Sequence, residues 1–340
     1  MDFKACFDQV YPTLPGALFS ERYINRIREL APELKCFSLA SLEFRLAEND
    51  DTIDLALGFK ADTNFAWLED FIQNQFTVNA NDPEPTQGID PVLLYFTRLN
   101  RERLFWEGAN EGFWLNLDLR NSSNTPVPWT YMVFRELNLG PGFYIAVLKK
   151  TLGTFGFKDS RTTMDGMQDV ILKLPDNAFL LGLALPTWRN ANTFRLVIYG
   201  MSFDQILNFL GAVQWPGDLK EITLSLESVA GQCKKLGLLI DIMEGKIQAK
   251  IGVELLVHAS YQAQHIKQLL QSLVRMGLCD PVKEQVLNLW AGKEIKSKNW
   301  LKHHSIPNSL NVRQWINHFK LVYHPGQPIL AKGYLGFQPF

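Results

Sequence analysis

Two stretches of alternating apolar and polar residues, joined by a turn, recur along this chain. The copies are residues 36–60, 177–200, 236–258 and 318–338, with a less regular copy expected between Leu94 and Arg120. Such alternation is typical of a β-strand with one buried face, and two such strands joined by a turn form a hairpin. Five hairpins predict ten mostly antiparallel strands, enough to close a barrel that can hold a ligand.

Segments with apolar residues three and four positions apart lie between these hairpins. They are residues 20–33, which Ser20 can cap, 64–76, 203–213 after Ser202, and 261–278. This spacing is typical of a helix with one buried face. The predicted fold class is therefore α+β: a ten-stranded, mostly antiparallel barrel of five repeated hairpin–helix units, with the helices packed outside. Residues 1–340 are expected to form a single domain.

Five segments lack a clear core pattern. Residues 80–90, 120–130 and 156–170 are predicted to be loops, and 127–154 is compatible with either a strand pair or a helix. Residues 291–314 are basic and irregular. They are expected to form either a lid or partner-binding segment, or an ordinary solvated connection.

Composition narrows the class of protein. The chain has 46% hydrophobic and 20% charged residues, which is typical of a globular protein. Its net charge of −1 argues against a broad nucleic-acid-binding surface. No apolar run approaches the length of a membrane span, and the first residues lack a secretory signal, so we expect a cytoplasmic location. The four cysteines are far apart, without CxxC spacing, and are expected to be free, largely buried thiols: Cys6, Cys36, Cys233 and Cys279.

The polar faces of the strands carry the candidate chemistry. Side chains alternate along a strand, so in a barrel wrapped by helices the polar face points into the lumen. The inward set mixes cations, aromatic residues and a few carboxylates: Ser41, Glu43, Arg45, Asp54, Lys60, Trp114, Asn116, Asp118, Arg120, Arg195, Val197, Tyr199, Lys250, Gly252, Glu254, His258, His318, Lys320, Lys332 and Tyr334.

Two explanations of this mixture stay open. Buried charges are costly unless they are paired, so ion pairs such as Glu43–Lys60 or Asp118–Arg195 could account for it without a ligand. Alternatively, cations that converge with tyrosine hydroxyls suit an anion with many acceptor oxygens, such as a diphosphate. The sequence has no P-loop and no GxSxG motif, and its six histidines show no metal-binding spacing, so no metal ligand is assigned.

The repeated units, with polar residues lining the lumen, resemble the ABBA prenyltransferases, a family of soluble aromatic prenyltransferases that also includes enzymes that prenylate cyanobactin peptides. The most specific pieces are NTFRLVIYG at 192–200 with the helix MSFDQILNFL that follows, and HFKLVYHPGQPILAKGYLGF at 318–337. Members often carry Arg-x-Lys-x-Tyr on inward strand positions to bind diphosphate. Here Arg195 and Tyr199 fit that pattern, and Val197 replaces the lysine.

The resemblance implies transfer of an allylic C5 or C10 isoprenoid from its diphosphate to an electron-rich acceptor. Glu43 is then the base or acceptor anchor. The diphosphate-binding residues would be Arg45, Lys60, Arg195, Lys320 and Lys332, and the residues that shield the allyl cation would be Trp114, Tyr199 and Tyr334. The partners would be a prenyl diphosphate and either a ribosomal peptide or a small aromatic acceptor. Mg²⁺ can accompany the diphosphate, or the strand cations can neutralise it alone.

Two other classes of function remain open at this point. The barrel could bind a hydrophobic ligand or peptide without catalysis. It could also belong to another peptide-modifying enzyme, whose lumen cations bind a carboxylate or phosphate substrate.

Overall fold

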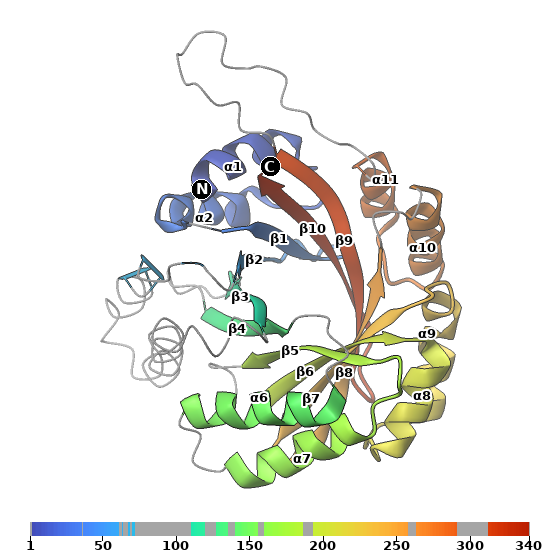
Figure 1. Cartoon of the computed structure of the whole chain (residues 1–340). Coiled ribbons are helices and arrows are strands. Elements are labelled where there is room, and N and C mark those ends of the chain that lie inside the picture. Colours follow the sequence, from blue (N-terminus) through green and yellow to red (C-terminus); the bar gives the residue numbers. More distant parts are fainter. Residues whose placement is uncertain are drawn as a thin grey trace.

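Ten strands close into one barrel in a computed structural model of the chain (Figure 1). The structure describes residues 2–35, 37–60, 63, 67–68, 70–71, 110–119, 127–134, 140–155, 160–185, 193–257, 263–290 and 312–339. The strands are β1 (Leu39–Arg45), β2 (Ile53–Lys60), β3 (Asn110–Asp118), β4 (Val127–Phe134), β5 (Phe179–Leu185), β6 (Thr193–Met201), β7 (Leu236–Met243), β8 (Lys246–Leu256), β9 (Val312–Tyr323) and β10 (Leu330–Pro339). Every neighbouring pair is antiparallel, and β1 closes the barrel against β10. The predicted barrel is confirmed.

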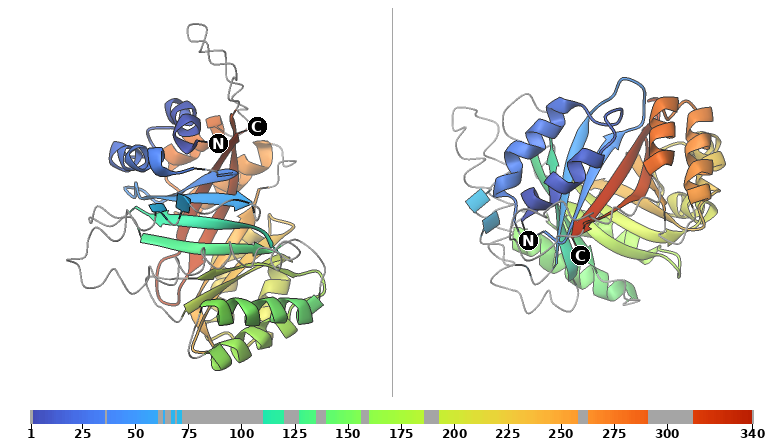
Figure 2. Two further views of the ribbon diagram at one scale, coloured as in Figure 1. Left: turned by 60° about the vertical axis from the view of Figure 1, so that its left-hand side comes forward. Right: turned by 90° about the horizontal axis from the view of Figure 1, so that it is seen from above.

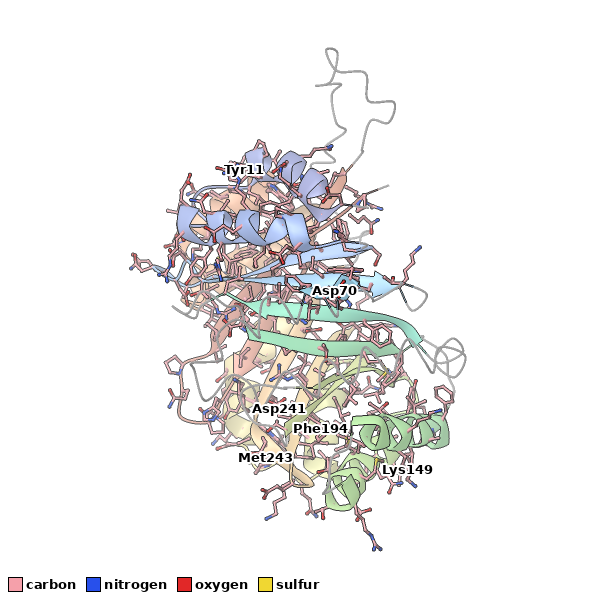
Figure 3. All side chains as sticks on the ribbon, turned by 90° about the vertical axis from the view of Figure 1, so that its left-hand side faces the viewer. Tyr11, Asp70, Lys149, Phe194, Asp241 and Met243 are labelled. Carbon is pink, nitrogen blue, oxygen red and sulfur yellow. The ribbon has the colours of Figure 1, made fainter. Side chains whose placement is uncertain are left out.

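Helices pack around the outside of the barrel, as Figures 1 and 2 show. They are α1 (Phe3–Val10), α2 (Glu21–Leu30), α6 (Gly140–Phe155), α7 (Ser160–Leu172), α8 (Phe203–Ala212), α9 (Leu219–Ala230), α10 (Ala263–Arg275) and α11 (Pro281–Trp290). Helix α1 contacts β9 and β10, α7 contacts β7 and β8, and α8 contacts β6. In Figure 3, Tyr11 beside α1 and Lys149 on α6 mark opposite ends of the molecule. None of the described helices combines the length and apolar character needed to cross a membrane.

The apolar strand faces form the core beneath these helices. Leu42, Phe44, Leu55, Leu196 and Val253 all point outward and are fully buried. Their burial leaves the alternate, more polar positions to face the lumen. The predicted assignment of strand faces holds on these strands and places the candidate site inside the barrel, whereas Arg120 and His258, also predicted to point inward, lie outside the described residues.

Local signals explain where some helices begin. The Ser202 side chain accepts a hydrogen bond from the Gln205 backbone, and the Gln205 side chain accepts one from the Ser202 backbone. This capping box satisfies two backbone N–H groups at the start of α8. Ser20 also precedes its helix, α2, as predicted, but its side chain makes no capping hydrogen bond.

The structure corrects several predicted boundaries. The second hairpin is formed by β3 and β4, so it lies at 110–134 rather than between Leu94 and Arg120. The loop predicted at 120–130 overlaps β4, and the undecided segment 127–154 contains both β4 and most of α6. Within the segment 291–314, residues 312–314 already belong to β9. The rest of that segment, the loop at 80–90 and most of the helix at 64–76 lie outside the described residues.

The prediction of a loop at 156–170 is wrong, because Ser160–Leu172 forms helix α7. Met164, Met167, Val170 and Ile171 are buried on one side of it. Their spacing is helical, and the polar residues between them obscured the pattern.

Cys6, Cys233 and Cys279 are free and buried, as predicted, and Cys36 lies outside the described residues. Burial raises the pKa of all three described thiols, that of Cys233 to about 11. These thiols are therefore unreactive core residues.

Candidate functional site

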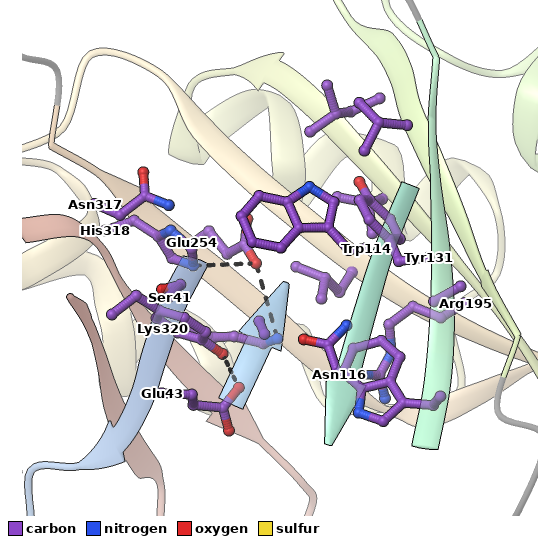
Figure 4. Close-up of a pocket in the computed structure, with 18 of the residues that line it drawn as sticks. Ser41, Glu43, Trp114, Asn116, Tyr131, Arg195, Glu254, Asn317, His318 and Lys320 are labelled. Carbon is purple, nitrogen blue, oxygen red and sulfur yellow. Dashed lines mark hydrogen bonds and ion pairs between the residues drawn. The ribbon is translucent and has the colours of Figure 1, made fainter. Parts of the chain in front are cut away.

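A cavity of about 190 Å³ lies inside the barrel and is lined by side chains from all ten strands (Figure 4). The lining residues are Ser41, Glu43, Ala56, Trp114, Asn116, Trp129, Tyr131, Val133, Leu181, Ala184, Arg195, Val197, Tyr199, Leu239, Glu254, Asn317, His318, Lys320 and Tyr334. The fold thus gathers residues from both ends of the sequence around one space. Mostly apolar walls with a few converging polar groups are typical of a ligand site.

Aromatic rings form much of the cavity wall. The three residues predicted to shield a cation, Trp114, Tyr199 and Tyr334, all line it. Sequence reasoning missed Trp129 and Tyr131, because both fall in segments whose strand was not recognised. Rings on several strands surround the centre of the cavity, and their faces can stabilise a positive charge there.

Glu43 stands in a dense cluster of partners. Its Oε1 accepts hydrogen bonds of 2.6 Å from both Arg45 and Lys332, and its Oε2 accepts one from the Tyr334 hydroxyl. Burial alone would raise the pKa of Glu43, but Lys332, Lys320 and Arg45 together hold it well below its usual value. Glu43 is therefore ionised, and both of its oxygens are already engaged.

Glu254 is a second carboxylate in the same cavity. Its Oε2 accepts a 2.5 Å hydrogen bond from the Tyr199 hydroxyl. Its Oε1 lies 3.6 Å from His318 Nε2 and 3.8 Å from Lys320 Nζ, and Figure 4 marks both contacts. Sequence reasoning placed Glu254 on the inner face but assigned it no role, because alternation gives a side chain's direction and not its partners.

Arg195 pairs with a carboxylate that the sequence did not single out. Its Nε and Nη2 donate hydrogen bonds of 2.6 and 2.9 Å to the two oxygens of Asp241, on the neighbouring strand β7. Burial lowers the pKa of Arg195, but Asp241 outweighs that effect and raises it. Among the described residues Arg195 therefore pairs with Asp241, where the sequence suggested Asp118, and Glu43 pairs with Arg45 and Lys332, where the sequence suggested Lys60.

Lys320 is a cavity cation whose one described ion pair is long, 3.8 Å to Glu254. It is only 7% exposed, and its ammonium makes no hydrogen bond to any residue that the structure describes. It lies 5.8 Å from the centre of the Tyr334 ring. Burial lowers the pKa of Lys320. Because a buried ammonium without hydrogen bonds is costly, Lys320 is suited to bind an anion or water in the cavity.

Other lining groups also lack hydrogen-bond partners among the described residues. They are Ser41 Oγ, the Tyr131 hydroxyl and His318 Nε2. Unpartnered buried polar groups that converge on one space are suited to bind water or a ligand that carries polar atoms.

The five predicted diphosphate-binding residues fall into three groups. Lys320 and Arg195 line the cavity, whereas Arg45 and Lys332 lie beside it and bind Glu43. Lys60 is exposed at the end of β2 and does not line the cavity. Val197 lines the cavity at the position where the family pattern has a lysine.

Glycines at inward positions let long side chains lie against the wall. A Cβ at Gly237 would come within 2.5 Å of the Tyr199 ring, and one at Gly252 within 3.1 Å of Lys320 Cε. A strand glycine commonly marks such a close approach. These two positions therefore help to keep the centre of the barrel open.

No group of three or more His, Cys, Asp or Glu side chains in the described ranges is arranged to hold a metal ion. A Mg²⁺ ion that accompanies a diphosphate obtains most of its ligands from phosphate oxygens and water. Glu254 and Asp241 are the carboxylates nearest to Lys320 and Arg195 that could add a further oxygen.

Comparison with known proteins identifies the fold as that of the ABBA-type prenyltransferases. The structure of NotF in complex with brevianamide F and DMSPP has a TM-score of 0.59 at 13% identity, covering 98% of this chain and 94% of that one. The prenyltransferase PriB, in a complex with L-tryptophan and dimethylallyl thiolodiphosphate (DMSPP), has a TM-score of 0.55 at 13% identity, covering 94% and 92%. AnaPT from Neosartorya fischeri has a TM-score of 0.53 at 11% identity, covering 87% and 77%. No protein-family model and no curated protein sequence matches the chain.

Proposed function

We propose that this protein transfers a dimethylallyl group from dimethylallyl diphosphate to an aromatic acceptor inside the barrel. The observation that carries the proposal is Lys320, a buried ammonium without a hydrogen bond among the described residues, on an aromatic-lined cavity. The fold supports it, since NotF and PriB share this barrel and their structures contain DMSPP. An allylic diphosphate joins the two features that this cavity is built to receive, an anion and a developing carbocation.

Lys320 and Arg195 are the residues proposed to bind the diphosphate. The Lys320 ammonium donates no hydrogen bond to a described residue, whereas Arg195 already donates two hydrogen bonds to Asp241. Arg45 and Lys332 contribute positive charge from behind Glu43. Mg²⁺ is proposed as an optional companion of the diphosphate, with Glu254 or Asp241 as a protein ligand.

The proposed reaction breaks the C1–O bond of the allylic diphosphate, and the bonding electrons leave with the diphosphate. The resulting allyl cation lies among Trp114, Tyr199 and Tyr334, whose rings stabilise it and exclude water. A ring carbon or heteroatom of the acceptor attacks C1, and a carboxylate removes the proton that the acceptor loses. No step requires an oxidant or a reductant.

The size of the cavity favours a small donor. An apolar cavity of about 150 Å³ accommodates one benzene molecule, and this cavity measures about 190 Å³. That space fits a C5 group and part of one aromatic ring better than it fits a C10 chain. For the acceptor we propose an indole or phenol ring, carried either by a small molecule or by a side chain of a ribosomal peptide.

The test is a thermal-unfolding scan with DMSPP, using inorganic pyrophosphate and phosphate as controls, with and without Mg²⁺. At about 100 times Kd, a ligand adds roughly 2.7 kcal/mol of stability and raises Tm by several degrees. We expect DMSPP to raise Tm more than either control, and Lys320→Met to abolish the shift. Lys60→Met, which removes an exposed lysine from the end of β2, should retain it.

Two results would reject the proposal. The first is a Tm that DMSPP and its geranyl counterpart both leave unchanged. The second is a full DMSPP shift in Lys320→Met. In the first case a non-catalytic barrel that binds an uncharged hydrophobic ligand becomes the better interpretation, and apolar ligands would be screened by the same shift.

A further inference from the structure

Strand β9 extends past its neighbour β8 at one end of the barrel. Residues His318–Tyr323 pair with β8, whereas Val312–Ile316 continue past the end of β8 and pair with β10 on their other side. In Figure 1 this part of β9 and β10 rises beside α1. Within the described part of the chain, no backbone hydrogen bond reaches the side of Val312–Ile316 that faces away from β10. This β9 edge therefore presents backbone N–H and C=O groups that can pair with a further strand.

The two faces of the β9 edge differ. Val312, Gln314 and Ile316 are buried on the side of the helices. Arg313 and Trp315 alternate with them and point to the inner side, where Arg313 is exposed and Trp315 is half-buried. The Arg313 guanidinium lies 5.9 Å from the centre of the Trp315 ring and makes no ion pair with a described residue. The inner face thus offers a cation and an aromatic ring to a neighbouring chain.

The β9 edge leads to the cavity. Asn317 and His318, the next residues along β9, both line the cavity. The Trp315 ring lies across Gly336 of β10, where a Cβ would come within 2.8 Å of the ring. Gly336 pairs on its other side with Ser41, whose side chain also lines the cavity. A chain paired with the β9 edge therefore has one of its ends beside the cavity.

We propose that the β9 edge, Val312–Ile316, is the docking surface for an extended peptide that carries the aromatic acceptor. The inference rests on the proposed function and selects a peptide as the acceptor over a free small molecule. The peptide pairs antiparallel with β9, as every neighbouring pair of strands in the barrel does, and continues the line of β8. Its acceptor residue comes first, at the level of Asn317, and the paired residues follow it in the peptide sequence.

This geometry determines which peptide residues matter. Side chains alternate along a strand, so the acceptor and the residue four positions after it both point inward. Antiparallel pairing places that later residue opposite Arg313, which precedes Asn317 by the same interval. An acidic side chain there forms a cross-strand pair with the Arg313 guanidinium, and no described ion pair has to break. A free aromatic amino acid lacks all of these contacts and binds more weakly.

The experiment measures by calorimetry the binding of the acetylated, amidated peptide Trp-Thr-Val-Thr-Glu-Thr to the full chain. We expect the reversed peptide, Thr-Glu-Thr-Val-Thr-Trp, to bind about tenfold more weakly, because it cannot pair antiparallel with its tryptophan at the cavity. Two forms of the first peptide are N-methylated at alternate amides, one at the second and fourth residues and one at the third and fifth. Since alternate N–H groups face β9, one form should lose about tenfold in affinity and the other should retain it.

A charge exchange tests the contact with Arg313. Arg313→Glu should weaken binding of the peptide roughly threefold, and a peptide with lysine in place of its glutamate should bind that variant at least as well as it binds the wild type. The matched control is Arg161→Glu at the exposed start of α7, which should leave both affinities unchanged. Both residues are exposed, and an unchanged Tm confirms that each variant is folded.

The inference is overturned if the first peptide does not bind, if its two N-methylated forms bind equally well, or if Arg313→Glu treats the acidic and basic peptides alike. Sedimentation that shows a dimer which the peptide cannot dissociate would also overturn it, because a second copy of the chain would then cover the edge. If the peptides bind as expected but dimethylallyl diphosphate yields no prenylated product, the proposed function fails while the docking surface stands. If free L-tryptophan is prenylated and the peptides show no preference, the docking surface fails and the proposed function stands.

Discussion

The hydroxyl of Tyr199 on β6 donates a 2.5 Å hydrogen bond to Glu254 on β8, across the strand that separates them. The residue between them on β7 is Gly237, which pairs with Tyr199 on one side and with Glu254 on the other. A Cβ at this glycine would lie 2.5 Å from the Tyr199 ring and 3.1 Å from Glu254 Cβ. The hydrogen bond therefore exists because β7 carries no side chain at this point.

Gly237→Ala is expected to push the Tyr199 ring away from Glu254. Overpacking of this kind costs about 1–3 kcal/mol of unfolding free energy, measured by urea denaturation. The matched control is Gly153→Ala in the exposed part of α6, where nothing lies within 4 Å of the added Cβ. Alanine should stabilise that helix by roughly 0.5–1 kcal/mol. Equal effects of the two variants would show that Gly237 has no special role.

Tyr199→Phe should separate the hydrogen bond from the packing of the ring. We expect a loss of about 1–3 kcal/mol in unfolding free energy, since Glu254 loses its one hydrogen-bond donor among the described residues. The control is Tyr323→Phe, which removes another 2.5 Å Tyr–Glu hydrogen bond, to Glu221 on the outer helix α9. Both variants should lose stability, but only Tyr199→Phe, which changes the cavity wall, should alter the Tm shift that DMSPP produces. An equal change of the DMSPP-induced Tm shift in both variants would contradict a role of Tyr199 in the cavity.

The alternation of residues predicted the barrel, and the structure explains why it was a sufficient guide. Leu42, Phe44 and Leu196 must be covered by helices, and that requirement sends Glu43 and Arg195 to the opposite face. A shift of one residue in register would reverse both faces, so burial fixes the register strongly. The direction of each lumen side chain follows from the sequence for this reason.

The partners of those side chains could not be predicted in the same way. Arg195 meets Asp241 because β6 and β7, which are joined through helices α8 and α9, pair in a register that includes a bulge, and the alternation does not reveal that register. Tyr131 was missed because Pro128 and the loop-forming residues before it hid the start of β4. Charge pairing across strands depends on tertiary geometry, which a single sequence does not contain.

Asp241→Asn is expected to release Arg195 for an anion in the cavity. In the wild type, the Arg195 guanidinium donates two hydrogen bonds to the Asp241 carboxylate. Without the negative charge, affinity for inorganic pyrophosphate should rise by about tenfold, measured by calorimetry. The control is Asp169→Asn on α7, which breaks the exposed pair with Lys173, the residue after that helix, and should leave affinity unchanged. Unchanged affinity in Asp241→Asn would place the diphosphate away from Arg195.

Lys283 on α11 should contribute strongly to stability although it does not line the cavity. Its ammonium donates hydrogen bonds to the carbonyls of Arg45, Ala47 and Asp50, at 3.0, 2.7 and 2.7 Å. Lys283→Met leaves these carbonyls without that donor and should cost about 3 kcal/mol in urea unfolding. Lys173→Met, at the exposed residue that follows α7, should cost less than about 0.5 kcal/mol. Similar costs for the two lysines would show that water replaces Lys283 without penalty.

The buried ring of His318 should make the protein less stable as the pH falls below about 6.5. Burial is the largest influence on its pKa and lowers it, and Lys320 lowers it further. Glu254 and Glu43 raise the pKa, but the net change is downward from 6.5. The ring also stacks on Tyr334 at 4.0 Å, which leaves little room for water. The unfolded chain then binds a proton between pH 6.5 and the lowered pKa, whereas the folded chain does not, so protons favour unfolding in that window.

His318→Gln removes this titration, so the unfolding free energy of the wild type minus that of the variant should fall between pH 7.5 and pH 5.5. The slope can reach about 1.4 kcal/mol per pH unit, the value for one proton. Urea denaturation at the two pH values measures this difference. Both pH values lie above the range in which most carboxylates take up protons, so the change in the difference reports the protonation of His318. A difference that stays constant, or one that grows as the pH falls, would mean that the folded protein accepts the proton on His318, with Glu254 stabilising the charged ring.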